Sequence, residues 1–300
     1  MVLTLLQQVL TMFLLSFVGY LLFKGGKLTL EGSKNLGNIL INVSLPCVIV
    51  QSFMSERTPE KTAGLLWSAL AAALILGISM AVSAFVFKKD AIGAFAAAFS
   101  NPGFFGIPLI TAAFGTGAVF YVAAYIAFLN LLQWTWGVSM ITGNKTGLKL
   151  KNVVRAPFLI AIAIGLVLFF TGIPVPGPVR SCVSFLAGLN TPLAMFTIGV
   201  YLAQCDLLAM FRRSVLYKIS AVRLLLVPVL AAVLLLVLPG TAEMKTSILI
   251  AAACPVGSNV AVYAQLHDKD YPYAVQTVII STLLCVVTIP LLVGIMERFF

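Results

Sequence analysis

Charged side chains are scarce in this sequence. They make up 9% of its 300 residues, whereas apolar residues make up 61%. A soluble globular chain has about 25% charged and about 45–50% apolar residues, so these few charges cannot cover a water-facing surface. The composition therefore excludes a cytosolic enzyme, a secreted disulfide scaffold and a disordered protein. It predicts an integral membrane protein whose solvent is the lipid bilayer.

Acidic residues are absent from the interiors of the apolar runs. All of them lie in connections or at the ends of runs: Glu31, Glu56, Glu60, Asp90, Asp206, Glu243, Asp268, Asp270 and Glu297. A carrier that relays protons at mid-membrane needs an embedded carboxylate. Proton exchange on such a group is therefore disfavoured, and a sodium site would have to use backbone carbonyls and Asn, Ser or Thr oxygens.

Signatures of metal sites and hydrolases are also missing. The sequence has one histidine, His267, and its five cysteines form no CxxC pair. There is no HExxH motif, and we predict no metal site, no cofactor and no enzymatic activity. His267 stands beside Asp268, Lys269 and Asp270, which favours a solvated loop; a gating or protonation role is the alternative.

What the sequence does contain is long apolar runs. A membrane-spanning helix needs roughly 20 apolar residues, and ten runs approach that length. They cover residues 2–23, 34–54, 62–87, 91–114, 116–141, 156–172, 179–203, 215–238, 245–265 and 271–296. No alternating pattern of a membrane barrel is present. The prediction is an all-α membrane protein with ten transmembrane helices, the first of which is retained, because no basic residue precedes Lys24.

The net charge of +10 is distributed unequally between the two sets of connections. Thirteen basic residues fall in one set: Lys24, Lys27, Lys34, Lys88, Lys89, Lys145, Lys149, Lys151, Arg155, Arg212, Arg213, Lys218 and Lys269. Five fall in the other: Arg57, Lys61, Arg180, Lys245 and Arg298. Cytoplasmic loops carry the excess of Lys and Arg. We therefore expect both termini outside, and we assign the basic excess to topology rather than to a nucleic-acid partner.

The basic connection 143–155 divides the chain into two five-helix halves, 1–142 and 156–300. Because five is odd, the second half is expected to be inverted. Helix four contains Ser-Asn101-Pro102-Gly103, and helix nine contains Cys-Pro255-Val-Gly257-Ser258-Asn259. Helices two and seven carry weaker interruptions, Asn42 to Pro46 and Asn190 to Pro192. Paired Gly/Pro breaks in corresponding spans indicate the binding site of a transporter.

Physical chemistry explains why such breaks bind ligands. Proline removes a backbone donor and glycine lets the helix unwind. Unwound backbone is tolerated at membrane depth only when it is buried in protein or lines a cavity. Each break leaves N–H ends with partial positive charge and C=O ends with partial negative charge. We therefore predict that two crossed breaks bind substrate through Asn101, Pro102, Gly103, Pro255, Gly257, Ser258 and Asn259. Asn101 could also cap the second half of helix four.

Several of these stretches resemble a known family. Ser-Asn-Pro-Gly-Phe-Phe-Gly-Ile-Pro-Leu at 100–109 resembles the fourth-helix signature of the auxin efflux carrier family. That family includes plant PIN carriers and bacterial carriers of malonate or malate. Cys-Pro-Val-Gly-Ser-Asn at 254–259 resembles the ninth-helix break of its bacterial members, and Asn-Thr-Pro-Leu-Ala-Met-Phe-Thr-Ile-Gly at 190–199 resembles its seventh helix.

The resemblance implies two inverted five-helix repeats with crossed broken helices four and nine. It implies a scaffold of helices 1, 2, 6 and 7 that forms a homodimer, and a transport domain of helices 3–5 and 8–10 that moves in an elevator or rocking motion. It places Asn101 where plant members contact a substrate carboxylate, and it points to a bacterial inner membrane. The long cytoplasmic loop of many plant members is missing here, so neither its regulation nor auxin as substrate is supported.

The function predicted is secondary transport of a small organic anion. Two alternatives remain open: a sodium-coupled symporter resembling the bile-acid carriers, and a membrane sensor built on a carrier fold. Arg223, inside the eighth run, is expected to snorkel to the cytoplasmic interface, or else to attract anions into a cavity. Asn42 and Asn190 are expected to form hydrogen bonds between helices, with a role in the site as the alternative.

The charge asymmetry generates a test of topology. In a background without the native cysteines, Lys149→Cys should resist an impermeant maleimide added outside intact cells, because the 143–155 connection is expected in the cytoplasm. Arg57→Cys, in an outside connection, should react and serves as the control. Labelling of the first variant from outside would contradict the topology.

Overall fold

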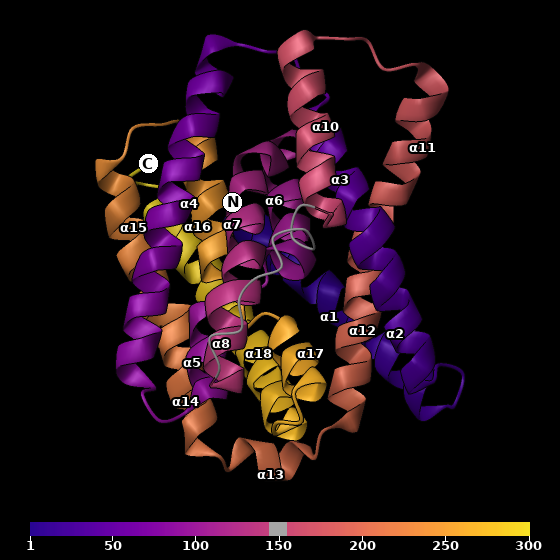
Figure 1. Cartoon of the computed structure of the whole chain (residues 1–300), viewed down its shortest axis with the longest axis vertical. Coiled ribbons are helices and arrows are strands. Elements are labelled where there is room, and N and C mark those ends of the chain that lie inside the picture. Colours follow the sequence, from indigo (N-terminus) through magenta and orange to yellow (C-terminus); the bar gives the residue numbers. More distant parts are fainter. Residues whose placement is uncertain (144–154) are drawn as a thin grey trace.

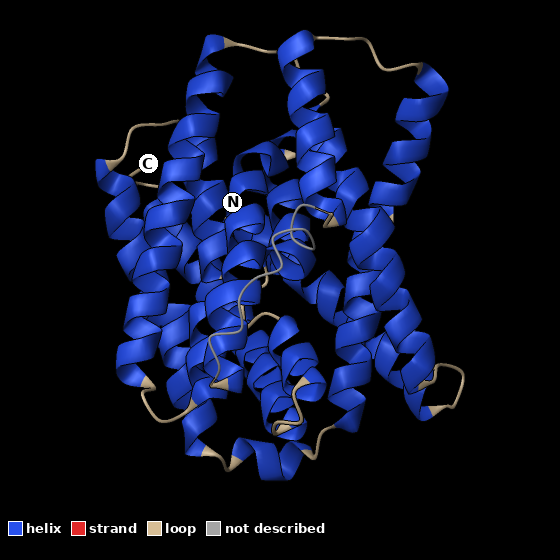
Figure 2. Cartoon of the chain, viewed as in Figure 1, coloured by secondary structure: helices blue, strands red, loops and turns tan. Residues whose placement is uncertain are grey.

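A computed structural model describes residues 1–143 and 155–300. Within these ranges helices joined by short loops make up the chain, no strand is formed, and one isolated bridge is present (Figures 1 and 2). The all-α prediction is therefore confirmed for the described residues. The predicted connection 143–155, with Lys145, Lys149 and Lys151, lies almost wholly outside them.

The helices follow one another with short connections. Those of the first half are α1 (Val2–Lys24), α2 (Leu30–Ile39), α3 (Leu45–Phe53), α4 (Pro59–Val86), α5 (Ala91–Ala98), α6 (Ile107–Phe114), α7 (Ala123–Leu132) and α8 (Val138–Thr142). Those of the second are α10 (Pro157–Thr171), α11 (Gly177–Gly188), α12 (Asn190–Gln204), α13 (Leu207–Phe211), α14 (Ser214–Ala221), α15 (Val227–Val237), α16 (Ala242–Ala253), α17 (Asn259–Leu266) and α18 (Tyr271–Met296).

Seven helical segments of the described chain are long and apolar enough to cross a membrane. They are Val2–Lys24, Leu30–Phe53, Pro59–Val86, Thr116–Thr142, Gly177–Gln204, Ser214–Val237 and Tyr271–Met296. Each matches one of the ten predicted ranges to within a few residues. The three other ranges contain α5 with α6, α10, and α16 with α17. Two of these are interrupted by unwound chain, and α10 has only 15 residues.

The interruptions predicted in helices two and seven are smaller than expected. Between α2 and α3 the helix continues through a π-helical turn at Leu40–Ser44, directly before Pro46. Between α11 and α12 only Leu189 leaves the helix. A π-helical turn accommodates one extra residue without releasing the chain, so Asn42 and Pro46 stay within a continuous helical segment.

The connections gather at two ends of the molecule. Residues 25–29, 87–90, 267–270 and the short α13 lie at the lower end in Figure 1, and residues 54–58 and 172–176 lie at the upper end. Two aspartates at the lower end cap the helices that start there. Asp90 Oδ1 accepts a hydrogen bond from Gly93 N at 2.8 Å, and Asp270 Oδ1 accepts one from Tyr273 N at 2.9 Å. These acidic residues therefore lie at helix starts because they cap free N–H groups.

Two glycines bring α1 and α12 into direct backbone contact. A Cβ on Gly19 would lie 2.6 Å from the Cα of Phe196, and one on Gly199 would lie 2.7 Å from the backbone nitrogen of Tyr20. Small residues at crossing points let membrane helices approach closely, and packing is then the main attraction between them.

This contact generates a stability prediction. Gly199→Ala should lower the free energy of unfolding by about 1–3 kcal/mol, because the new methyl group can fit only if the backbones separate. Gly77→Ala is the matched control, since a Cβ there meets nothing within 4 Å. The measurement is the melting temperature of each purified variant in detergent. Equal melting temperatures for the two variants would contradict the prediction.

Candidate functional site

The fourth and ninth predicted spans are both broken, at the positions expected from their sequences. Helix α5 ends at Ala98, and helical structure resumes at Pro102 with a π-helical turn that leads into α6. Helix α16 ends at Ala253, and α17 begins at Asn259. Pro102 and Pro255 have no N–H to continue the preceding helix. Each break is therefore set locally by its proline.

The two breaks lie against each other and form a short antiparallel bridge between Ser100 and Val256. Asn101 N donates to the Pro255 carbonyl at 2.9 Å, and Gly257 N donates to the Phe99 carbonyl at 3.0 Å. Backbone groups released by unwinding thus pair across the bridge, which removes the cost of leaving them unpaired in a dry interior. We call these two segments, Phe99–Asn101 and Cys254–Ser258, the crossing.

The close approach requires glycine at position 257. A Cβ on Gly257 would lie 2.8 Å from the Ser100 carbonyl oxygen. Any side chain would push the two segments apart and weaken the bridge. The role of Gly257 shown by the geometry is therefore to let the backbones meet.

Two predicted site residues bond to each other across the crossing. Asn101 Nδ2 donates to Ser258 Oγ at 3.1 Å, and both side chains are buried. Asn101 Oδ1 also accepts from Phe104 N at 3.3 Å, so Asn101 caps the helix that follows it. Helix capping and a hydrogen bond across the crossing are thus combined in one side chain. Since Ser258 Oγ accepts the bond from Asn101, its own hydroxyl proton is available to a ligand.

Three further polar side chains hold the crossing in place. Gln133 Oε1 accepts from Asn259 Nδ2 at 2.7 Å, Ser281 Oγ accepts from Val256 N at 3.0 Å, and Tyr125 Oη lies 3.4 Å from Ser100 Oγ. The sequence reasoning missed all three. The available signal was a polar residue inside an apolar run, since such residues usually face the protein interior and have partners.

Arg223 lies elsewhere than the sequence predicted. It does not snorkel: its side chain is 0% exposed. It projects from a π-helical turn, Val222–Leu226, between α14 and α15. Nη1 donates to the carbonyls of Ala97 at 3.2 Å and Ala98 at 3.0 Å, and Nη2 donates to the carbonyl of Ala252. The guanidinium therefore caps the carboxyl ends of both α5 and α16.

A serine completes the surroundings of this guanidinium. Ser79 Oγ on α4 accepts from Arg223 Nη1 at 3.2 Å and donates to the Ala98 carbonyl at 2.6 Å. Among the described residues no acidic group forms an ion pair with Arg223, and its Nε has no hydrogen-bond partner. The dipoles of two helix carboxyl ends therefore provide the compensation for this buried charge.

Of the other secondary candidates, one bonds to the chain next to the crossing and two do not. Asn190 Nδ2 donates to the Gly103 carbonyl at 3.2 Å, which is the hydrogen bond between helices that was predicted. Asn42 Nδ2 instead donates to Asn38 of its own helix, so the prediction of a bond between helices is wrong for Asn42. His267 lies at the carboxyl end of α17, where it follows the last helical residue.

Two cavities approach the crossing. A pocket of about 70 Å³ at the crossing is lined by residues that include Asn101, Pro102, Gly103, Gly257, Ser258 and Asn259. Ser258 and Asn259 also line a larger cavity of about 540 Å³, which extends along the start of α2 past Lys34 toward Tyr271. A separate cavity of about 320 Å³ is lined by Gln8, Gln51, Thr111, Ser184 and Asn190. The predicted site residues are thus brought together, with Pro255 contributing its carbonyl to the bridge.

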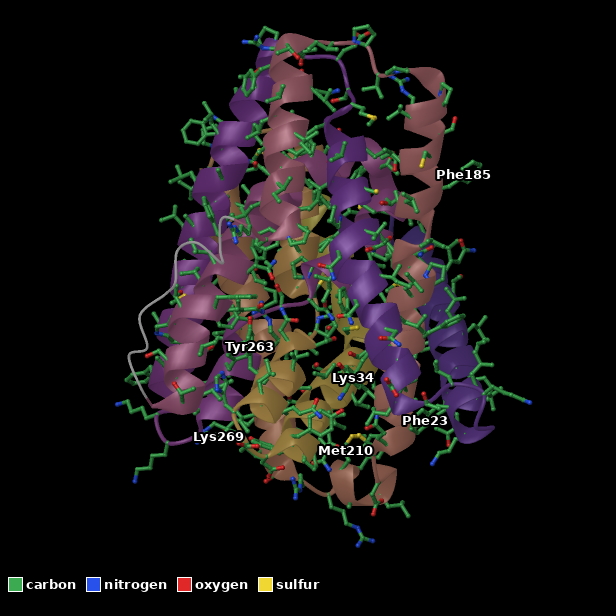
Figure 3. The ribbon with its side chains drawn as sticks, turned by 45° about the vertical axis from the view of Figure 1, so that its right-hand side comes forward. Phe23, Lys34, Phe185, Met210, Tyr263 and Lys269 are labelled. Carbon is green, nitrogen blue, oxygen red and sulfur yellow. The ribbon has the colours of Figure 1, made fainter. Side chains whose placement is uncertain are left out.

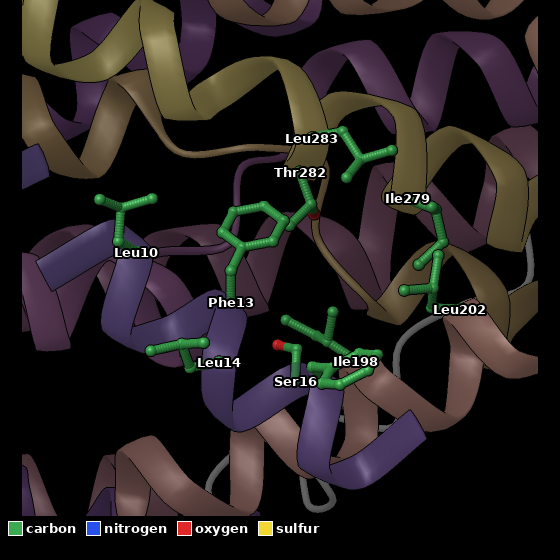
Figure 4. A pocket seen from close by; sticks show the side chains of 10 residues that line it. Leu10, Phe13, Leu14, Ser16, Ile198, Leu202, Ile279, Thr282 and Leu283 are labelled. Carbon is green, nitrogen blue, oxygen red and sulfur yellow. The ribbon is translucent and has the colours of Figure 1, made fainter. Parts of the chain in front are cut away.

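Another hollow is of a different kind. The groove between α1, α12 and α18 measures about 500 Å³ and is lined mainly by aliphatic and aromatic side chains, including Leu10, Phe13, Ile198 and Leu283 (Figure 4). Such a lining offers few partners to a charged ligand. This groove therefore suits an anion less well than the polar pocket at the crossing does.

Comparison with known proteins gives a consistent picture. The family model described as "Membrane transport protein" matches residues 4–293. A protein of Methanothermobacter thermautotrophicus named "Uncharacterized transporter" is 27% identical over 310 positions, which cover 95% of this chain and 96% of that protein. A protein of Rhizobium meliloti named "Putative malonate transporter" is 28% identical over 302 positions, which cover 94% and 92%.

The match extends over nearly the whole chain, and it includes both halves of the crossing. It confirms the resemblance noted at residues 100–109, 190–199 and 254–259 at the level of the family. The apolar helices, the buried polar crossing and this match together indicate a transporter rather than an enzyme. The chain belongs to the membrane transport protein family, the family of the auxin efflux carriers.

Proposed function

We propose that this protein is a secondary transporter that carries a small organic anion, a carboxylate, by alternating access. The observation that carries the proposal is the pair of buried amide and hydroxyl groups at the crossing, Asn101 and Ser258, which line a pocket shared with a larger cavity. A carboxylate accepts hydrogen bonds only, and both groups are able to donate. Helical segments also begin at Pro102 and Asn259, and helix amino ends favour negative charge.

The charges around the crossing favour an anion over a cation. Arg223 is the only charged side chain of the described residues that is fully buried, and it bonds to both helices that end at the crossing. The 540 Å³ cavity has Lys34 in its wall. The carbonyls at the carboxyl ends of α5 and α16 accept hydrogen bonds from Arg223. These are the oxygens that a sodium ion at the crossing would need. The arrangement therefore supports an organic-anion carrier over the sodium-coupled alternative.

The two cavities support an alternating-access mechanism. The 540 Å³ cavity reaches Ser258 and Asn259 from the end of the molecule where α2 begins, which carries the predicted cytoplasmic connections. The 320 Å³ cavity approaches from the side of Gln51 and Thr111, and it stops at Asn190, which bonds to Gly103. In this arrangement the substrate enters from the cytoplasmic side, and transport requires the crossing to open toward the second cavity.

The finer architecture is part of the proposal. Ten membrane spans in two inverted five-helix repeats fit the ten helical ranges and the equivalent positions of the two broken helices. In that arrangement α1 to α3 and α10 to α12 form the scaffold, and α4 to α8 and α14 to α18 carry the crossing. We place the protein in a bacterial inner membrane with both termini outside, because of the distribution of Lys and Arg.

Malonate is the appropriate first ligand to test, because one relative of this chain is named "Putative malonate transporter". Asn101→Ala should weaken malonate binding by roughly 10- to 150-fold, since a hydrogen bond to a charged group contributes about 1.5–3 kcal/mol. Asn190→Ala should weaken it less, because Asn190 bonds to a backbone carbonyl. The measurement is the ligand-induced shift in melting temperature of purified protein, followed by uptake into proteoliposomes.

Asn42→Ala is the matched control, since Asn42 bonds within its own helix and should leave binding unchanged. Wild-type affinity in the Asn101 variant would remove Asn101 from the site. If Ser258→Ala and Asn259→Ala also bind malonate as the wild type does, the crossing is not the binding site.

We also infer a homodimer whose interface includes the second and seventh spans. The supporting feature is the apolar outer face of α11, where Phe185 is 80% exposed and Val179 is 49% exposed (Figure 3). Cys182 is exposed on the same helix. A bismaleimide cross-linker applied to native membranes should therefore give a dimer that Cys182→Ser abolishes. Recovery of monomer alone from the wild type would count against the dimer.

A further inference from the structure

The crossing by itself has no preferred sign of charge. Two helices end there, α5 at Ala98 and α16 at Ala253, and two helical segments begin there, at Pro102 and Asn259. A helix carries about half a negative charge at its carboxyl end and about half a positive charge at its amino end. The four ends therefore sum to about zero, and the same backbone could serve a cation or an anion.

Arg223 removes this balance. Its guanidinium is fully buried and donates to carbonyls of both helices that end at the crossing. An arginine side chain stays protonated in proteins, and no described carboxylate pairs with this one. One full positive charge therefore offsets the two negative helix ends, while the two positive ends meet only the neutral side chains of Asn101 and Ser258.

We propose that Arg223 is a specificity-determining residue that gives the crossing its positive sign, so that the site selects ligands by charge and prefers dianions, such as dicarboxylates, to monoanions. Arg223 acts through the field at the site, because carbonyls occupy its Nη1 and Nη2 groups and no ligand needs to touch it. The choice of ligand class rests on the proposed function, whereas the sign of the field does not.

The chain geometry sets the size of the effect. Arg223 Nη1 lies 3.0 Å from the Ala98 carbonyl oxygen, and Asn101 is three residues further along. Three extended residues span at most about 11 Å, so the charge lies within about 14 Å of the site. At that distance, with an effective dielectric constant of about 20, loss of the charge weakens binding roughly tenfold for each negative charge on the ligand.

The first experiment measures the effect of the Arg223 charge at the crossing in the absence of substrate. In a background in which Cys47, Cys182, Cys205, Cys254 and Cys285 are replaced, Ser258→Cys places a thiol in the wall of the 540 Å³ cavity. The rate of its alkylation by iodoacetamide is measured against pH. Because a nearby cation stabilises the thiolate, adding Arg223→Gln should move the midpoint of this profile upward by about one pH unit.

Two variants separate charge from structure. Arg223→Lys keeps the positive charge with fewer donors and should hold the midpoint near that of the parent. Ser79→Ala removes one acceptor of the guanidinium without removing charge, and it should also leave the midpoint in place. A purely structural role would move the midpoint in Ser79→Ala and Arg223→Lys as much as in Arg223→Gln.

The second experiment tests selectivity with two probes of equal length, malonate and its monoamide, malonamate. From wild type to Arg223→Gln, malonate should lose about 100-fold in affinity and malonamate about tenfold. Equal losses for the two probes would overturn the proposal, as would an unchanged alkylation midpoint. The proposal would also be overturned if Arg223→Gln and Arg223→Met both failed to fold while Arg223→Lys folded. The positive charge would then be required for folding and not for the choice of ligand.

The two proposals fail in different ways. If wild-type protein binds neither probe but Arg223→Gln shifts the alkylation midpoint, the choice of carboxylate substrates is wrong and the role of Arg223 stands. If malonate binds as expected and the midpoint does not move, the transport function stands and the role of Arg223 is wrong.

Discussion

The rest of this structure depends on one constraint: backbone groups released from a helix inside a membrane have no water to bind. The chain breaks two helices at the same depth and pairs the released groups with each other, Asn101 N with the Pro255 carbonyl and Gly257 N with the Phe99 carbonyl. The remaining carbonyl ends are capped by Arg223. The features on which the proposed anion site rests follow from this arrangement, because the same unwinding that had to be compensated also leaves helix amino ends beside Asn101 and Ser258.

Charged side chains are few in this protein, and the acidic and basic ones lie in different surroundings. Acidic residues begin helices at the ends of the molecule, where Asp90 and Asp270 cap free N–H groups. Within the interior described by the structure, a single fully buried cation lies among carbonyls. An ion pair would also have stabilised that arginine, but a carboxylate beside the crossing would repel the anionic ligand that we propose. The carboxyl ends of two helices accept hydrogen bonds from its Nη1 and Nη2 groups without placing a second formal charge near the site.

Much of this arrangement could be predicted from the sequence, because its determinants are local. Apolar runs indicate the helical ranges, and the breaks lie at Pro102 and Pro255, where a glycine stands close to each proline. The partners of Arg223 could not be predicted, since they come from α4, α5 and α16, and their meeting depends on how these helices pack. The contact of Gln133 with Asn259 could not be predicted for the same reason. Pro46 belongs to one of the two weaker interruptions, and the chain stays helical there through a π-helical turn, which shows that a change of helical pitch can accommodate a local signal of this kind.

The hydrogen bond from Asn190 to the Gly103 carbonyl joins α12 to the broken helix. Hydrogen bonds between membrane helices contribute on average about 0.6 kcal/mol, which is close to the thermal energy. Asn190 Oδ1 is buried as well and has no partner in the described structure. This hydrogen bond therefore contributes little to the energy that holds α12 against the broken helix, and it can break and form again at small cost.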